Sequence, residues 1–94
     1  MPKEILTIIN KRGLHARAAA KLARTAGNFS ACVQVRIASS ANEYPWADAK
    51  SVMSLMLLAA AQGTQIEVQA NGDDEEQAMQ TICALIADYF EEGE

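Results

Sequence analysis

The sequence is poor in the residues that build metal and disulfide sites. It contains one histidine and two cysteines, Cys32 and Cys83, which have no metal-ligand spacing. A single histidine cannot complete a zinc site with them, so we expect no bound metal. We interpret the two cysteines as small hydrophobic residues of a reducing compartment.

Long apolar runs are also missing. No run approaches the length of a bilayer span, and the chain does not begin with a charged-then-apolar leader that ends in a small-residue cleavage site. We therefore expect a cytoplasmic protein without membrane insertion. Half of the 94 residues are apolar, which suffices for one two-layer core, and residues 1–94 are predicted to form a single domain.

Positive charge is scarce beyond the first third of the chain. The net charge is −4, seven of the eight Lys and Arg residues lie within positions 3–36, and eleven of the twelve acids lie from position 43 onward. An acidic chain without an interleaved basic and aromatic surface is a poor match for nucleic acid. A basic region on an acidic body suits acidic protein partners or a phosphate.

The apolar patterns predict the order βαββαβα. Strands are expected at 4–9, 31–38, 43–46 and 65–70, and helices at 16–26, at 51–60 and from residue 73 onward. In the first strand, Leu6 and Ile8 compete with Ile5 and Ile9 for the buried face, and Pro45 favours a sheet edge for the third strand. Such an order gives an α+β fold with helices on one face of an antiparallel sheet, and pattern alone does not separate it from ferredoxin-like folds.

The helices carry further expectations. The first should bury Ala19, Leu22, Ala23 and Ala26 and end at Gly27-Asn28. The second should begin at Ser51 as N-cap and stop before Gly63. It is apolar almost all round, so Val52, Met53 and Met56 are expected to form an exposed patch. Asp73 and Glu76 match a capping box for the third helix, which should bury Met79, Ile82, Cys83, Ile86 and Phe90.

The stretch Gly13-Leu14-His15-Ala16-Arg17 joins the first strand to the first helix. A histidine there would occupy the helix N-cap or the position beside it. The free N–H groups at a helix start, here those of Ala16, Arg17 and Ala18, carry about half a positive charge and suit a phosphoryl group. The same field disfavours imidazolium, so we expect a neutral, nucleophilic imidazole, and the Arg17 guanidinium adds donors for phosphoryl oxygens. On spacing alone, a surface polar pair is the alternative.

Two motifs carry a resemblance to a known family. Residues 10–17, Asn-Lys-Arg-Gly-Leu-His-Ala-Arg, and residues 49–56, Ala-Lys-Ser-Val-Met-Ser-Leu-Met, resemble the active-site and regulatory-serine motifs of the bacterial histidine-containing phosphocarrier (HPr) family of the sugar phosphotransferase system. The resemblance covers nearly the whole chain. It implies an open-faced β-sandwich with strand order 1-4-2-3 and three helices on one face.

The resemblance also implies a function. Enzyme I, charged by phosphoenolpyruvate, would place a phosphoryl group on Nδ1 of His15 (pros-phosphohistidine), with Arg17 beside it, and a IIA-type protein would receive it. Such a protein is a carrier rather than a complete enzyme, needs no cofactor and is expected to be a monomer. Ser51 would be the regulatory site of an HPr kinase/phosphorylase. We expect partners to dock on Lys21 and Arg24 of the first helix together with Val52, Met53 and Met56.

Two questions stay open at this point. The C-terminal run 86–92, aromatic and then acidic, leans toward the nitrogen-related type, NPr, rather than the sugar branch. A regulatory binding module acting mainly through Ser51 and the Met53/Met56 surface is the alternative function, although the retained His15 favours the carrier. One departure falls inside the active stretch: the family usually has proline after the arginine, and this chain has Ala18.

Overall fold

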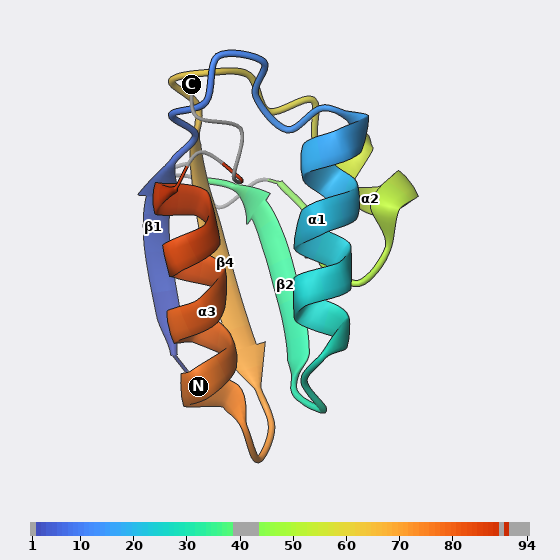
Figure 1. The fold of residues 1–94 in the computed structure, drawn as a ribbon, viewed down its shortest axis with the longest axis vertical. Coiled ribbons are helices and arrows are strands. Elements are labelled where there is room, and N and C mark those ends of the chain that lie inside the picture. Colours follow the sequence, from blue (N-terminus) through green and yellow to red (C-terminus); the bar gives the residue numbers. More distant parts are fainter. Residues whose placement is uncertain (1, 39–43, 89, 91–94) are drawn as a thin grey trace.

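A computed structural model describes residues 2–38, 44–88 and 90. Within them, a four-stranded antiparallel sheet has the order β1-β4-β2-β3 and helices cover one of its faces (Figure 1). The strands are β1 (Lys3–Thr7), β2 (Cys32–Ile37), β3 (Ala47–Asp48) and β4 (Gln65–Asn71), and the helices are α1 (Ala16–Gly27), α2 (Val52–Met56) and α3 (Glu75–Ala87). The predicted α+β order and the 1-4-2-3 sheet are confirmed.

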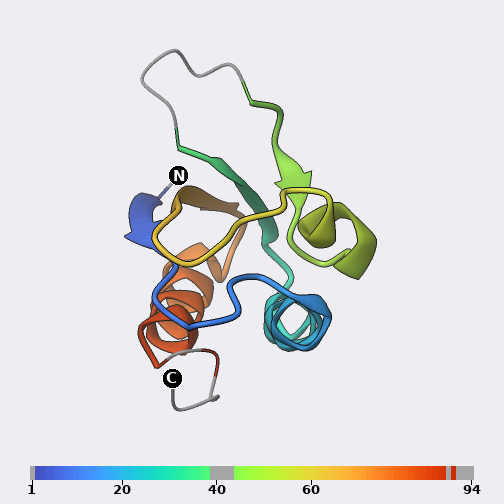
Figure 2. The same cartoon turned by 90° about the horizontal axis from the view of Figure 1, so that it is seen from above.

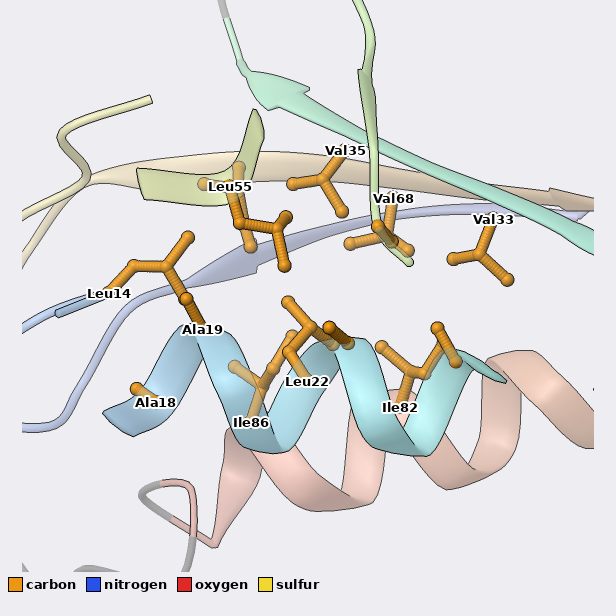
Figure 3. Packing of buried hydrophobic residues seen from close by; sticks show 14 of the residues in the cluster. Leu14, Ala18, Ala19, Leu22, Val33, Val35, Leu55, Val68, Ile82 and Ile86 are labelled. Atoms are coloured by element: carbon orange, nitrogen blue, oxygen red, sulfur yellow. The ribbon is translucent and has the colours of Figure 1, made fainter. Parts of the chain in front are cut away.

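The core lies between the sheet and the helix pair α1 and α3. Figure 2 shows these two helices side by side on one side of the sheet, with α2 beside α1 and β3. In Figure 3, Val33 and Val68 of the sheet point toward Leu22 of α1 and Ile82 of α3, all fully or almost fully buried. Burying each such side chain stabilises the fold by about 1.5–3 kcal/mol.

The α1 face is buried as predicted, from Ala19 through Leu22 and Ala23 to Ala26. Its small side chains let the helix lie close to the sheet. The predicted end also holds, because the helix stops at Gly27 with Asn28 as C-cap.

In β2 and β4, alternate side chains face the core, and these are Val33, Val35, Ile66, Val68 and Ala70. Burial shows which side chains at β1 face the core. Ile8, just after the strand, is fully buried and Leu6 packs against the core, whereas Ile5 is 59% exposed on the opposite face.

The third strand lies later than predicted. It spans Ala47–Asp48, paired with Val35 and Gln34 at the edge of the sheet, whereas 43–46 was expected. Pro45 has no N–H to donate, so regular pairing begins after it. The Arg36 guanidinium carbon lies 4.1 Å from the centroid of the Trp46 ring. Residues 39–43, which include the first residue of the expected strand, lie outside the described residues.

Helix α2 is half as long as predicted. Ser51 is its N-cap, as expected, but the helix ends at Met56, and Ala59 has a φ of +53°. After the helix, the Ala59 N–H donates to the Met56 carbonyl at 3.1 Å, and the Ala60 carbonyl accepts a hydrogen bond from Leu14 N at 2.8 Å. Gly63 does not end a helix; its N–H donates to the Ile8 carbonyl at 2.8 Å, in the turn before β4.

The expected capping box of α3 is wrong. The helix begins at Glu75, and its N-cap Asp74 makes no side-chain cap bond. The Asp74 carboxylate instead accepts hydrogen bonds from Ser30 N (2.9 Å), Ser30 Oγ (3.3 Å) and Ala31 N (2.8 Å). These bonds, the Ser30 N–H above all, hold the pKa of Asp74 below its ordinary value.

The apolar face of α3 is buried as expected at Met79, Ile82 and Ile86, while Cys83 is half-buried. Burial, with a smaller contribution from the Glu4 charge, raises the pKa of the Cys83 thiol. Phe90 is fully buried, but it follows the helix end at Ala87 and has a φ of +52°. The acidic residues 91–94 lie outside the described part.

Candidate functional site

His15 caps the N-terminus of α1. Its backbone is extended (φ −81°, ψ −179°), and its carbonyl accepts the first intrahelical bond, from Ala19 N at 2.8 Å. The N–H groups of Ala16, Arg17 and Ala18 precede that bond, so they are the donors that a helix start leaves without an i−4 partner. The predicted N-cap placement and the predicted backbone donors coincide at this end of α1, at the top of Figure 1.

The His15 imidazole is turned toward these donors. Its Nδ1 accepts a hydrogen bond from Arg17 N at 3.3 Å, and the side chain is half-buried. An accepting nitrogen carries a lone pair, so the nucleophilic electron pair of Nδ1 faces the positive end of α1. A phosphoryl group bonded to Nδ1 would place its oxygens among the same N–H groups.

The residues next to His15 divide between solvent and core. Arg17 and Ala16 are exposed, which leaves the guanidinium accessible to a phosphoryl group at the surface. Ala18 is fully buried, and its methyl group belongs to the core cluster (Figure 3). Its contribution to an anion site is therefore its backbone N–H alone.

The loop before His15 is held by hydrogen bonds that were not predicted from the sequence. Asn10 is fully buried, its Nδ2 donates to the Gly13 carbonyl at 2.7 Å, and Gly13 N donates to the Asn10 carbonyl at 3.1 Å. Leu14 N then reaches the Ala60 carbonyl at 2.8 Å. The Asn-x-x-Gly pattern predicts a turn here, and the bond from Gly13 N to the Asn10 carbonyl closes it.

The predicted basic face of α1 is present, but its members differ in their contacts. Lys21 is half-buried, and its Nζ donates to the Phe90 carbonyl at 2.9 Å. Arg24 is exposed in the last turn of the helix. The expected partner residues thus include one cation already hydrogen-bonded within the chain and one that faces solvent.

The apolar patch expected on α2 is present, with differences at both of its ends. Met53 and Met56 are 70% and 42% exposed, whereas Val52 is half-buried against the core. Leu57, just after the helix, is 81% exposed and was not predicted. Leu57 lies beyond the end of α2 at Met56, and the sequence pattern did not predict this early end.

Ser51 lies at the other end of α2. Its Oγ accepts a hydrogen bond from Ser54 N at 3.3 Å, as an N-cap does, and the residue is half-buried. The neighbouring Lys50 sends its Nζ to the Phe29 carbonyl at 2.9 Å. Ser51 therefore lies at a helix start, and the side chain of its neighbour Lys50 is hydrogen-bonded to the loop between α1 and β2.

The described part of the chain offers neither a membrane span nor a metal cluster. No helix among residues 2–38, 44–88 and 90 is both long and apolar enough to cross a bilayer. In those ranges no group of three or more His, Cys, Asp or Glu side chains could hold a metal ion. Cys32 and Cys83 are free thiols.

An open-faced α+β sandwich with a histidine at the cap of its first helix is the architecture of a small phosphocarrier protein. Comparison with known proteins then gives the family: the chain belongs to the HPr phosphocarriers of the phosphotransferase system. The family model "PTS HPr component phosphorylation site" matches residues 2–88. The chain is 49% identical to "Phosphocarrier protein HPr" of Cupriavidus necator, over 94% of this chain and 93% of that protein.

Two further similarities bear on the fold and on the branch. The crystal structure of HPr-C-His from Thermoanaerobacter tengcongensis is 39% identical, with a TM-score of 0.84 over 98% of both chains. "Phosphocarrier protein NPr" of Escherichia coli K12 is 41% identical over 96% of both chains. Proteins of both types thus match along the chain, and the matches establish the family without assigning the branch.

Proposed function

We propose that the protein accepts a phosphoryl group on Nδ1 of His15 from enzyme I and passes it to a IIA-type protein. The observation that carries this proposal is the hydrogen bond from Arg17 N to His15 Nδ1, 3.3 Å long, because it aims the imidazole lone pair at the start of α1. Family membership supports a carrier role and partners within the phosphotransferase system in general.

In the proposed transfer, the Nδ1 lone pair attacks phosphorus and forms an N–P bond. The bond between phosphorus and the donor breaks in line, and its electron pair stays with the donor. Transfer to the acceptor repeats the step with Nδ1 as leaving group. Such chemistry needs positioning and charge stabilisation rather than an acid or base on this chain.

The charge stabilisation comes from the start of α1 and from Arg17. As the phosphoryl group arrives, its oxygens replace Nδ1 as acceptors of the Arg17 N–H, and the N–H groups of Ala16 and Ala18 lie in the same turn. The exposed guanidinium supplies a charge-assisted contact worth about 1.5–3 kcal/mol. Removing it should slow transfer by about 10- to 150-fold.

For partner docking we assign the exposed surface next to His15. It consists of the basic α1 residues and the apolar α2 patch, namely Arg17, Lys21, Arg24, Val52, Met53, Met56 and, newly, Leu57. Cations around an apolar centre complement an acidic partner with an apolar contact. Val52 contributes least, because it is half-buried.

Ser51 is the second, regulatory element of the proposal. A phosphate on Ser51 would add about −1.5 to −2 charge at the start of α2, which a helix N-terminus tolerates, and would repel an acidic partner. The competing interpretation is a plain N-cap, which the bond from Ser54 N to Ser51 Oγ supports directly. For this reason we rank the carrier above the regulatory binding module.

Incubation with enzyme I and phosphoenolpyruvate, followed by intact mass, tests the proposal. We expect the gain of one phosphoryl group that is acid-labile and base-stable, and none in His15→Ala. Arg17→Ala should react slowly, whereas the matched control Arg24→Ala should lose less, because Arg24 is far along α1 from His15. Phosphorylated His15→Ala would refute the assignment, and IIA-type acceptors from both branches would reveal the preferred receiver.

A further inference from the structure

Among the described residues, Asn10 is the one polar side chain that is fully buried. It lies between the end of β1 and His15, in a turn closed by the bond from Gly13 N to the Asn10 carbonyl at 3.1 Å. Burying an amide is costly unless it is hydrogen-bonded. The amide nitrogen of Asn10 is hydrogen-bonded, because Nδ2 donates to the Gly13 carbonyl at 2.7 Å.

The Gly13 carbonyl belongs to the peptide unit that joins Gly13 to Leu14. The other polar group of that unit, Leu14 N–H, donates to the Ala60 carbonyl at 2.8 Å. A peptide unit is planar, so a hydrogen bond on each side fixes the orientation of the whole plane. One side of this clamp is a side chain, that of Asn10, and the other is backbone.

The clamp lies directly before His15. Leu14 is 4% exposed and points into the core beside α1 (Figure 3). The chain before His15 is therefore held first by the hydrogen bonds of the Gly13–Leu14 peptide unit and then by the buried Leu14 side chain. The next residue is His15, whose extended backbone directs Nδ1 to Arg17 N. Rotation of the clamped plane would move the His15 backbone and with it the imidazole.

We propose that Asn10 is a positioning residue for phosphoryl transfer: by holding the Gly13–Leu14 peptide unit, it keeps Nδ1 of His15 aimed at the start of α1. This inference rests on the proposed role of His15 as the phosphoryl acceptor. Asn10 is buried and the docking surface is exposed, so Asn10 acts on the geometry of the reacting nitrogen and leaves the partner contacts unchanged. A misplacement of about 1 Å costs up to about 100-fold in rate.

The test is transfer from enzyme I to Asn10→Leu, with kcat and KM measured separately and corrected for the folded fraction. Leucine is close to asparagine in size and lacks the donor. We expect kcat to fall by about 10- to 100-fold with KM near its native value. Asn10→Ser, whose hydroxyl keeps a shorter donor, should recover part of the loss.

The matched control is Asp74→Ala. It removes three hydrogen bonds between the start of α3 and residues Ser30 and Ala31, which follow the far end of α1. It should lower stability and leave kcat per folded molecule at the native value. An equal fall of kcat in Asp74→Ala would show that Asn10 acts only through stability, and would overturn the inference.

A second measurement does not depend on phosphorylation. In NMR spectra, the Arg17 amide proton and the His15 Nδ1 nitrogen should lose the shifts of their mutual hydrogen bond in Asn10→Leu and keep them in Asp74→Ala. A native kcat or unchanged shifts in folded Asn10→Leu would reject the positioning role. If Asn10→Leu does not fold, Asn10→Ala, which also lacks the donor, decides by the same criteria, and failure of both to fold would also reject it. Absence of phosphorylation in the native protein would instead refute the proposed function, and the shifts would still test the inference.

Discussion

One added methyl group at Gly13 tests how closely the loop before α1 approaches the segment after α2. A Cβ at this position would lie 2.5 Å from the Ala60 carbonyl oxygen and 2.8 Å from Ala61 Cα, and the backbone φ is +68°. Both neighbours are backbone atoms, so neither can rotate away. Gly13→Ala must therefore strain φ and push residues 60–61 outward.

The size of the effect follows from these contacts. The left-handed backbone costs a non-glycine residue about 1–2 kcal/mol. Moving Ala60 also breaks its 2.8 Å bond from Leu14 N and leaves a buried donor unsatisfied, at about 1–3 kcal/mol. Reduced freedom of the unfolded chain returns about 0.4–1 kcal/mol. The free energy of unfolding should thus fall by about 1–5 kcal/mol, a large share of the total for a small domain.

Two other glycines provide matched controls in urea unfolding. Gly63 has a φ of +90°, but a Cβ added there would meet no atom within 4 Å, so Gly63→Ala carries the backbone strain alone. Gly27, at the end of α1, has open space and an ordinary φ, so Gly27→Ala should stabilise by up to about 1 kcal/mol. We expect the stability order Gly27→Ala, native, Gly63→Ala, Gly13→Ala. Equal losses at Gly13 and Gly63 would refute the close approach to Ala60.

Three further predictions concern charge and surface. Hydrogen bonds lower the pKa of Asp74, so the stabilising contribution of its carboxylate is complete above the ordinary carboxyl pKa and is lost as pH falls through the folded-state pKa. Asp74→Asn should therefore make the free energy of unfolding less dependent on pH in the acid range. An unchanged pH dependence would contradict this prediction. Ser51→Asp should slow phosphoryl transfer from enzyme I without unfolding the domain. Ser51→Ala should lower the free energy of unfolding by about 1 kcal/mol, because the N-cap bond is lost, and should transfer normally. Native kinetics in Ser51→Asp would reject a regulatory role of Ser51. Leu57→Ala should keep native stability within about 0.5 kcal/mol and weaken binding of enzyme I in an amide-shift titration; shift changes confined to α3 would argue against this surface.

Features set by local pattern were predicted well. Val33 and Val35 in β2, and Ile66 and Val68 in β4, alternate with polar residues, and a sheet buried on one face leaves only one register for such alternation. The place of His15 at the helix start, expected at the N-cap or beside it, was predicted for a similar reason, since it follows from the junction of an apolar run with an alanine-rich helix. Each of these features depends on neighbours within a few residues.

Features set by distant contacts were missed. The segment after α2 bonds to a distant part of the chain, because the Ala60 carbonyl accepts a hydrogen bond from Leu14 N. The Asp74 carboxylate accepts hydrogen bonds from the N–H groups of Ser30 and Ala31 and makes no cap bond to its own helix, so the expected capping box did not form. Local propensity cannot show that another segment needs a carbonyl or a carboxylate at that place.

Ala18 is the remaining departure from the family pattern, and Ala18→Pro tests what its N–H does. Ala18 is the third residue of α1, ahead of the first intrahelical bond from Ala19 N to the His15 carbonyl, so proline there breaks no helix bond. It removes one donor from the anion site, worth about 1 kcal/mol, but holds the turn more rigidly. We expect a native fold, slightly raised stability and transfer within about tenfold of the native rate. Ala20→Pro, beyond that first bond, is the control and should destabilise by about 3 kcal/mol or more. A collapse of phosphoryl acceptance in folded Ala18→Pro would show instead that the Ala18 N–H is an essential phosphate ligand, because no other group of the site changes.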